Sequence, residues 1–231
     1  MPQLGENPYG NWTAPFLREI EPLLANARHQ SNYAPLGVTL AVAIPDEVPL
    51  LTDHPLYGFL GPLVSALSLP QLKYAAATKA HGKLSTLCIG PVGQDFSSSH
   101  EWQNAAGHIE GLSVRMQRML GHQIATQVTP TRWGAVELDI AVRTGIMRDW
   151  VEAWKPLIES LVAIVGRRRE DVEEFEIETG RIVKLALHHD VNALLGDAIQ
   201  VDVRARLLER RMDGPPLDYD VRDDTAITRR G

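Results

Sequence analysis

The stretch RDWVEAWKPLIESL, residues 148–161, brings charged side chains together at the start of an expected helix. Arg148 and Asp149 open it, and Glu152 and Lys155 follow on the polar side. The other side consists of tryptophan and aliphatic residues at helical spacing, which predicts a buried face. Such a group of carboxylates and cations is either part of an active site or the solvent-exposed polar face of an amphipathic helix. Spacing alone favours the polar face, because nearly every surface helix has one.

The composition is typical of a globular protein with an ordinary core. The chain has 231 residues, of which 44% are hydrophobic and 23% are charged. This length is enough for one large core, for two small ones, or for one core built from two similar halves. The single cysteine, Cys88, excludes an internal disulfide and a thiolate zinc cluster.

Nothing in the sequence indicates a membrane segment or an export signal. The first residues, MPQLGENPYGNW, lack the basic and apolar regions of a secretory signal. No apolar run reaches the roughly 18 to 20 residues that a membrane span needs. We therefore expect a cytoplasmic protein without membrane contact.

The charge balance argues against a protein that coats nucleic acid. The formal net charge is −6, whereas nonspecific DNA affinity needs many phosphate contacts from Lys and Arg. A local basic edge, GRRR at residues 166–169, is compatible with DNA contact through Arg167, Arg168 and Arg169. The same arginines are also typical of a solvated helix end, where cations meet the negative end of the helix dipole.

The chain shows the same order of elements twice. The first half predicts a helix at 14–30, a strand at 37–45, a helix at 53–68 and strands at 72–79 and 84–92. After a Ser-rich connector, the second half predicts a helix at 101–123, a strand at 134–145, a helix at 148–166 and strands at 180–190 and 197–207. Both halves therefore have the order αβαββ.

Matching residues support this repeat. LGPLVSAL (60–67) aligns with WKPLIESL (154–161), and VTLAVAIP (38–45) aligns with VELDIAVR (136–143). The shared proline predicts that both helices start at equivalent points and carry the proline near the first turn, where it is tolerated. Chance is the alternative explanation, since amphipathic helices resemble one another.

We predict an α/β protein made by tandem duplication of the αβαββ unit, with mixed sheets covered by helices. The halves form either two sheets or one pseudo-symmetric pair that imitates a homodimer within one chain. The predicted division is a first unit at 1–97, a second unit with the candidate site at 98–208 and a flexible charged tail at 209–231.

The second half also resembles a known family. The run from Ala135 to Leu161 resembles the RusA family of Holliday-junction resolvases, small dimeric endonucleases that need magnesium. The family signature is a strand, a short loop and Arg-Asp-x-Asp-Asn-x-x-Lys at the start of a helix, followed by an acid and Ala-Leu. The matching residues are Arg148, Asp149, Lys155, Glu159 and Leu161. RIVKLAL (181–187) is similar to the strand that follows, and the first half shares only the order of elements.

The resemblance implies a structure-selective DNA endonuclease that acts on branched DNA with Mg²⁺. In such an enzyme, carboxylates hold the magnesium ion that polarises the phosphoryl oxygen and readies a water molecule. The implied metal ligands are Asp149, Glu152 and Glu178. Arg148 and Lys155 would meet the scissile phosphate and stabilise the developing charge.

The sequence departs from the family signature at the carboxylates. The second Asp of the signature falls on Val151, which cannot bind a metal, and its Asn falls on Glu152. In the first half, Asp53 is the only acid in this region and Gly61 replaces the Lys. The alternatives are therefore a catalytically degenerate descendant that binds DNA, and a non-enzymatic scaffold or protein-interaction module that kept the fold. A homo-oligomer is compatible with each.

Other polar clusters have simpler explanations. HHD at 188–190 could supply imidazole ligands, but adjacent histidines in a strand point to opposite faces and do not easily chelate one ion. Polarity at a hairpin end is the favoured explanation. The acidic run DVEEFEIE (171–178) is typical of a solvated loop. The sequence contains no Walker loop, dinucleotide fingerprint or nucleophile elbow.

Overall fold

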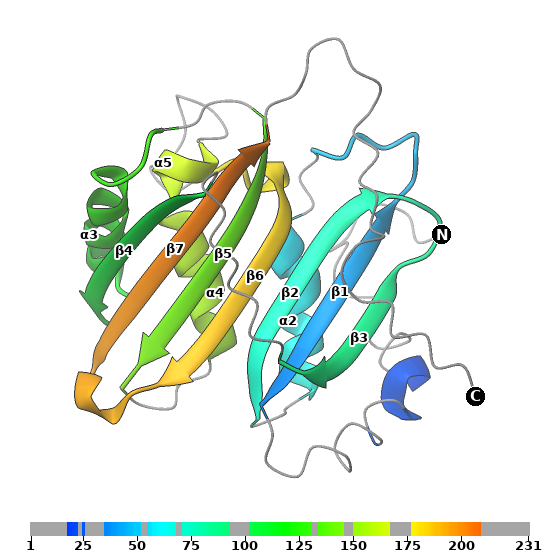
Figure 1. Ribbon diagram of the computed structural model, residues 1–231, viewed down its shortest axis with the longest axis horizontal. Helices are drawn as coiled ribbons and strands as arrows, with labels where there is room; N and C mark the ends of the chain where they lie inside the picture. Colours follow the sequence, from blue (N-terminus) through cyan, green and yellow to red (C-terminus); the bar gives the residue numbers. More distant parts are fainter. Residues whose placement is uncertain are drawn as a thin grey trace.

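The computed structural model describes residues 18–22, 25, 35–51, 55–67, 71–92, 102–130, 134–145, 150–166 and 177–208. One mixed sheet of seven strands organises these residues, with the strand order β3-β1-β2-β6-β5-β7-β4 (Figure 1). Its strands are β1 (Leu36–Ile44), β2 (Leu72–His81), β3 (Thr86–Pro91), β4 (Gln103–Glu110), β5 (Ala135–Thr144), β6 (Ile182–Val191) and β7 (Ala198–Leu208). The helices are α2 (Leu56–Leu67), α3 (Val114–Ala125), α4 (Trp150–Glu159) and α5 (Val162–Val165), with 3-10 turns η1 (Thr179–Arg181) and η2 (Ala193–Leu195).

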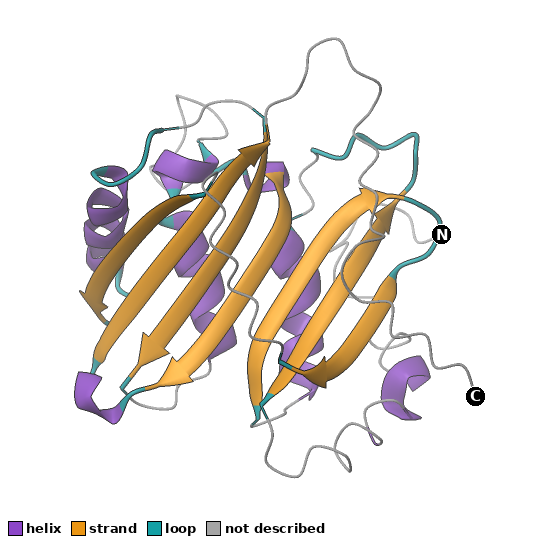
Figure 2. Ribbon diagram, viewed as in Figure 1, coloured by secondary structure: helices purple, strands orange, loops and turns teal. Residues whose placement is uncertain are grey.

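The predicted class, an α/β protein with a mixed sheet covered by helices, is confirmed. The helices α2, α3, α4 and α5 lie on one face of the sheet (Figure 2). There is one continuous sheet rather than two, because β2 and β6 pair with each other. None of the helices in the described ranges has the length and apolar character needed to cross a membrane.

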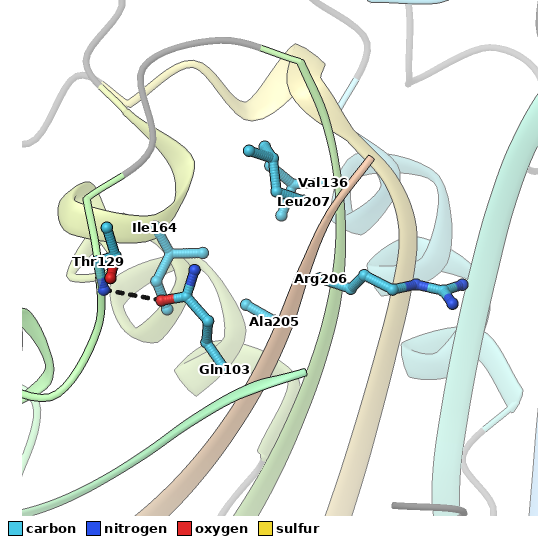
Figure 3. Close-up of a pocket in the computed structure, with 7 residues that line it drawn as sticks. All are labelled: Gln103, Thr129, Val136, Ile164, Ala205, Arg206 and Leu207. Carbon is cyan, nitrogen blue, oxygen red and sulfur yellow. Dashed lines mark hydrogen bonds between the residues drawn. The ribbon is translucent and has the colours of Figure 1, made fainter. Parts of the chain in front are cut away.

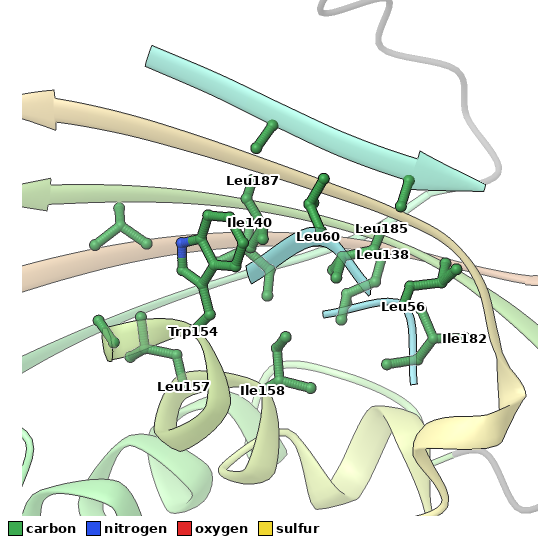
Figure 4. Close-up of a cluster of buried hydrophobic side chains, with 14 of the residues drawn as sticks. Leu56, Leu60, Leu138, Ile140, Trp154, Leu157, Ile158, Ile182, Leu185 and Leu187 are labelled. Atoms are coloured by element: carbon green, nitrogen blue, oxygen red, sulfur yellow. The ribbon is translucent and has the colours of Figure 1, made fainter. Parts of the chain in front are cut away.

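The core lies between the sheet and these helices. Strand side chains alternate between the two faces, and in β5 the residues on the helix-covered face are the buried apolar ones, Val136, Leu138, Ile140 and Val142. Trp154, Leu157 and Ile158 of α4 pack toward the same strands beside Leu56 and Leu60 of α2 (Figure 4). The two helices therefore share one hydrophobic cluster.

The two halves of the sheet have the same topology. β1 is followed by α2, then by β2 parallel to β1, then by β3 antiparallel to β1. The order β5, α4, β6, β7 repeats these relations, with β6 parallel and β7 antiparallel to β5. Each parallel pair also has an irregularity at its start, between Leu36 and Gly37 and between Val136 and Glu137. Descent of the two halves from one ancestral unit stays a prediction.

An approximate two-fold axis perpendicular to the sheet relates these halves. It passes between β2 and β6, where Ala76 is paired with Ala186. On one side of that pair Tyr74 faces His188, and on the other side Thr78 faces Lys184. The two units are thus joined by antiparallel pairing of equivalent strands.

The helices match at their buried positions. In α2 these are Leu56, Leu60, Leu63, Val64 and Leu67, and in α4 and just after it they are Trp150, Trp154, Leu157, Ile158 and Leu161. The two helices start at equivalent points, as predicted. The proline is not in the first turn, however, because Pro62 and Pro156 are each the seventh residue of their helix.

The sequence alignment of the first strands is shifted by two residues from the structural one. The sequence alignment makes Val38 equivalent to Val136. The position of the irregularity instead makes Leu36 equivalent to Val136 and Gly37 equivalent to Glu137. Because strand side chains repeat every two residues, the shifted alignment still assigns each residue to the correct face.

The predicted helix at 101–123 is wrong in its first half. Residues Gln103–Glu110 form strand β4, in which every second residue from Ala105 to Ile109 is buried or closely packed. Gly111 then has a φ of 84°, a conformation that suits glycine and ends the strand. Ser113 caps the helix that follows, since its hydroxyl accepts a hydrogen bond from the Met116 N–H. The predicted tail at 209–231 and the predicted boundary at residue 97 lie outside the described residues.

Candidate functional site

The polar side of α4 is solvated where the structure describes it. Lys155 is 65% exposed and its Nζ lies 3.7 Å from Oε1 of Glu159. This is the i,i+4 pairing of an ordinary helix surface. Burial raises the pKa of the Glu159 carboxyl, although Lys155 acts in the opposite direction. Glu152 is exposed in the first turn.

Val151, which replaces a metal ligand of the family signature, belongs to the packing between helices. It is half-buried, and its Cγ1 would lie 3.6 Å from a Cβ atom added to Gly61 of α2. Gly61 in turn occupies the place of the signature Lys in the first half. The two positions that depart most from the signature therefore face each other across the α2–α4 contact.

The start of α4 lies at the carboxyl end of β5 and β6. The ring of Trp150 stacks on the ring of His189, with centroids 5.2 Å apart and planes 9° apart. Nε2 of His189 is 3.2 Å from Oγ1 of Thr144, the last residue of β5. Glu152 is two residues beyond Trp150 and belongs to the same end of the unit.

Glu178 lies at the other end. Its backbone N–H donates to the Gly166 carbonyl just after α5, at 3.1 Å. Arg181 nearby donates from Nε to the Gly134 carbonyl at 2.8 Å and from Nη1 to the Val165 carbonyl at 2.7 Å. Gly134 directly precedes β5, whose ten residues span about 30 Å at 3.3 Å per residue.

The structure thus does not bring Glu152 and Glu178 together, because nearly the whole length of β5 separates their ends of the unit. Among the described residues, no group of three or more His, Cys, Asp or Glu side chains could hold a metal ion. Arg148 and Asp149, and the basic edge at Arg167, Arg168 and Arg169, lie outside the described residues.

His189 is a buried residue of the helix-covered face, with 6% exposure. Burial lowers the pKa of its imidazole to about 4, Lys73 acts in the same direction, and Asp190 opposes the shift. The neighbouring His188 points to the opposite face, where its Nε2 lies 3.1 Å from Oδ1 of Asp139. The predicted divergence of the two histidines is confirmed. Polarity at a hairpin end is the wrong explanation, because both rings have specific partners on the neighbouring elements β5 and α4.

The face opposite the helices carries a second polar cluster that the sequence did not predict. Asp139 is 8% exposed and is bound by Arg204 as well as by His188. Burial raises the pKa of the Asp139 carboxyl, but the hydrogen bonds from His188 and Arg204 outweigh it, and the pKa lies below its usual value. The ring of Tyr74 lies 4.8 Å from that of His188. Its hydroxyl pKa is raised by burial and by the Asp139 charge.

Two further ion pairs flank this cluster. Glu137, 5% exposed, accepts a hydrogen bond from Nε of Arg206 at 2.8 Å. Trp102 lies over both arginines, with its ring centroid 5.6 Å from Cζ of Arg204 and 5.4 Å from Cζ of Arg206. Near the carboxyl end of β5, Arg143 donates a hydrogen bond to Asp202 of β7 at 3.0 Å. We call these nine residues the polar face cluster: Tyr74, Trp102, Glu137, Asp139, Arg143, His188, Asp202, Arg204 and Arg206.

A sequence signal for this cluster exists. In VELDIAVR of β5 the acids occupy alternate positions, and in VDVRARL of β7 the arginines do. Alternate positions share a face of the sheet, and the antiparallel register places Glu137 opposite Arg206 and Asp139 opposite Arg204. The sequence shows the alternation but not the pairing of β5 with β7.

A small pocket lies on the helix-covered side, between β4, β5, β7 and α5 (Figure 3). Its lining is mainly apolar, and the side chain of Arg206 extends away from the other lining residues. The amide of Gln103 is already engaged, because its Oε1 accepts a hydrogen bond from the Thr129 N–H at 2.8 Å. The pocket therefore presents no convergent set of catalytic groups.

No protein-family model matches this chain, and no curated protein matches it. Among solved structures, the chain is similar to an empty FtsZ dimer from M. jannaschii, with 13% sequence identity and a TM-score of 0.30. The similarity covers 46% of this chain and 26% of that one. A similarity at this level carries no argument about function.

Proposed function

We propose that this protein is a non-enzymatic binding or scaffold protein that uses an α/β sheet as a rigid framework. One observation carries the proposal, namely that Glu152 and Glu178 stand at opposite ends of the β5–α4–β6 unit. A nuclease site of the RusA type needs its carboxylates around one magnesium ion, within coordination distances of about 2.1 Å. Val151 adds to this argument, because it replaces a ligand and packs toward Gly61 instead.

The buried polar groups also support a structural role. Asp139 and Glu137 are held by arginines from the neighbouring strand, and His189 is held by Thr144 and Trp150. Buried polar groups whose hydrogen bonds are all made inside the protein rigidify the core and make the strand pairing specific. They do not need a catalytic role to explain them.

A RusA-type endonuclease acting on branched DNA is the second candidate, and a specific feature favours it. The residues Arg148 and Asp149 directly precede α4, and α4 starts at the carboxyl end of the parallel strands β5 and β6. This is the edge at which α/β sheets bind ligands. In that case Asp149 with Glu152 would hold Mg²⁺, and Glu178 would take no part.

Incubation with a labelled four-way DNA junction and Mg²⁺ separates the two candidates. We expect no cleavage by wild type at high protein concentration, no difference between wild type and Asp149→Asn, and no change in melting temperature on adding Mg²⁺. Magnesium-dependent cleavage that Asp149→Asn abolishes and Glu178→Gln leaves intact would establish the nuclease and overturn the scaffold proposal.

A further inference from the structure

The two edges of the sheet are built differently. At β4, the side-chain amides of Gln123 in α3 and of Gln127 just after it bind the outward backbone groups. Gln127 accepts from the Ala106 N–H at 3.0 Å and donates to the Ala106 carbonyl at 2.7 Å. Gln123 does the same for His108, at 2.8 and 3.1 Å. These paired amide contacts imitate a neighbouring strand and close this edge against further pairing.

The other edge, β3, has no such paired amide contacts among the described residues. It pairs with β1, and no second strand pairs with it in the ranges that the structure describes. Its sequence, TLCIGP, contains no charged residue, and Pro91 at its end is the one residue of a type that protects edge strands. Thr86 and Cys88 are exposed at its surface.

The backbone groups of β3 that point away from β1 can be identified. The Val92 N–H donates to the Pro35 carbonyl at 3.2 Å, in line with the β1–β3 register. Because inward and outward residues alternate along an antiparallel strand, Thr86, Cys88 and Gly90 direct their backbone groups at β1. Leu87 and Ile89 therefore direct their N–H and C=O groups outward.

Equivalent edges elsewhere in the molecule pair with antiparallel strands. β7 is the counterpart of β3 in the second unit, and its outer edge carries β4 in antiparallel pairing from Gln103 to Glu110. The two units are also joined edge to edge, through the antiparallel pairing of the equivalent strands β2 and β6. Strand addition to a unit of this topology thus occurs twice within the chain.

We propose that β3 is a self-association edge, at which a second copy of this chain adds its own β3 in antiparallel pairing. A two-fold axis requires identical strands to run antiparallel, and an uncharged edge meets its own copy without repulsion. The register is centred on Cys88, so that Leu87 and Ile89 of one copy exchange hydrogen bonds with Ile89 and Leu87 of the other. Pro91, which has no N–H, then stays outside this ladder.

This register makes a distance prediction. The two Cys88 residues form a pair without backbone hydrogen bonds, in which the Cα atoms are about 4.5 Å apart. That distance lies within the range that a disulfide can bridge. A ladder of this length buries less surface than the roughly 1,200 Å² of a stable interface, so we expect association only at high concentration.

Two measurements test the proposal on the full-length chain. Sedimentation equilibrium under reducing conditions should show association as the concentration approaches about 1 mM, a range typical of weak contacts. Cys88→Ser should associate like wild type. Cys88→Lys should weaken association at least about threefold, because it places like charges opposite each other at an exposed position. Mild oxidation of wild type should trap a disulfide dimer.

A matched control uses the closed edge. Cys88→Ser combined with Ala106→Cys places one exposed cysteine on β4 instead of β3, and it should give no dimer on oxidation. A monomeric mass for wild type throughout the concentration range would overturn the proposal. Unchanged association of Cys88→Lys, or equal disulfide trapping through residue 106, would also overturn it.

Discussion

At the scale of single residues, the sheet gives neighbouring polar side chains opposite roles. His188 and His189 are adjacent in β6. His188 binds Asp139 on the face opposite the helices, whereas His189 stacks on Trp150 on the helix-covered face. The difference follows from the alternation of strand side chains. It also separates their electrostatics, because burial and Lys73 lower the pKa of His189 whereas His188 contacts the Asp139 carboxylate.

We predict that His189 makes the protein less stable as the pH falls from about 6.5 to 4. Its pKa is about 4 in the folded protein, below the usual value of about 6.5. The unfolded chain therefore binds more protons in this window, and the free energy of unfolding falls as the pH falls. His189→Phe keeps the stacking on Trp150 and should remove roughly 2 to 3 kcal/mol of this pH dependence between pH 7 and 4.5.

Urea unfolding of wild type and variant at the two pH values measures this difference. His108→Gln, at an exposed position of β4, is the control and should keep the wild-type pH dependence. An equal slope for His189→Phe and wild type would mean that the buried imidazole does not resist protonation.

At the scale of elements, α3 serves as a substitute strand for β4. Gln123 in the helix and Gln127 just after it each supply both a donor and an acceptor to one backbone residue, which an apolar side chain cannot do. Gly107 lies between these two residues, where an added Cβ would lie 2.3 Å from Cδ1 of Leu120. The absence of a side chain at this position allows the helix to approach the strand closely.

We predict that Gln123→Met and Gln127→Met each destabilise the protein by about 1 to 3 kcal/mol through the two hydrogen bonds to β4 that each loses, at roughly 0.5 to 1.5 kcal/mol each. Gln127→Met also loses the hydrogen bond from Nε2 to the Gln123 carbonyl at 2.8 Å. Amide hydrogen exchange locates the effect. Gln123→Met should speed exchange of the His108 amide and not that of Ala106, and Gln127→Met should do the reverse. Equal protection of both amides in both variants would show that the glutamines do not close this edge.

At the scale of the whole molecule, the two units form one sheet and share one core. β2 and β6 pair at the approximate two-fold axis, and residues of α2 and α4 belong to the same hydrophobic cluster. Neither unit can be removed without exposing this shared surface to water. The repeat in topology therefore does not imply two separately stable domains.

We predict a single cooperative unfolding transition. Leu60→Ala in α2 should cost about 2 to 5 kcal/mol, as expected for a fully buried leucine. In a Trp12→Phe background, which leaves tryptophans in the second unit alone, it should shift the tryptophan fluorescence transition as much as the far-UV circular dichroism transition. A fluorescence midpoint that stays at the wild-type value while the circular dichroism midpoint moves would indicate independent units.

The sequence by itself determined most elements and their buried faces, because hydrophobic periodicity is a local property. Eight of its strand and helix predictions correspond to β1, α2, β2, β3, β5, α4, β6 and β7. β4 was missed because Ile109 continues the apolar spacing of α3, although Gly111 and Ser113 mark the boundary between them. The spacing also predicted the charged stripe of α4.

Only the tertiary structure decided which of these residues meet. Glu152 and Glu178 are both carboxylates near the ends of elements, but the direction of β5 places them at opposite ends of one unit. Conversely, Asp139, His188 and Arg204 are far apart in sequence, and strand order and register join them. A local pattern carries no information on strand order or register, because both depend on pairing between distant segments.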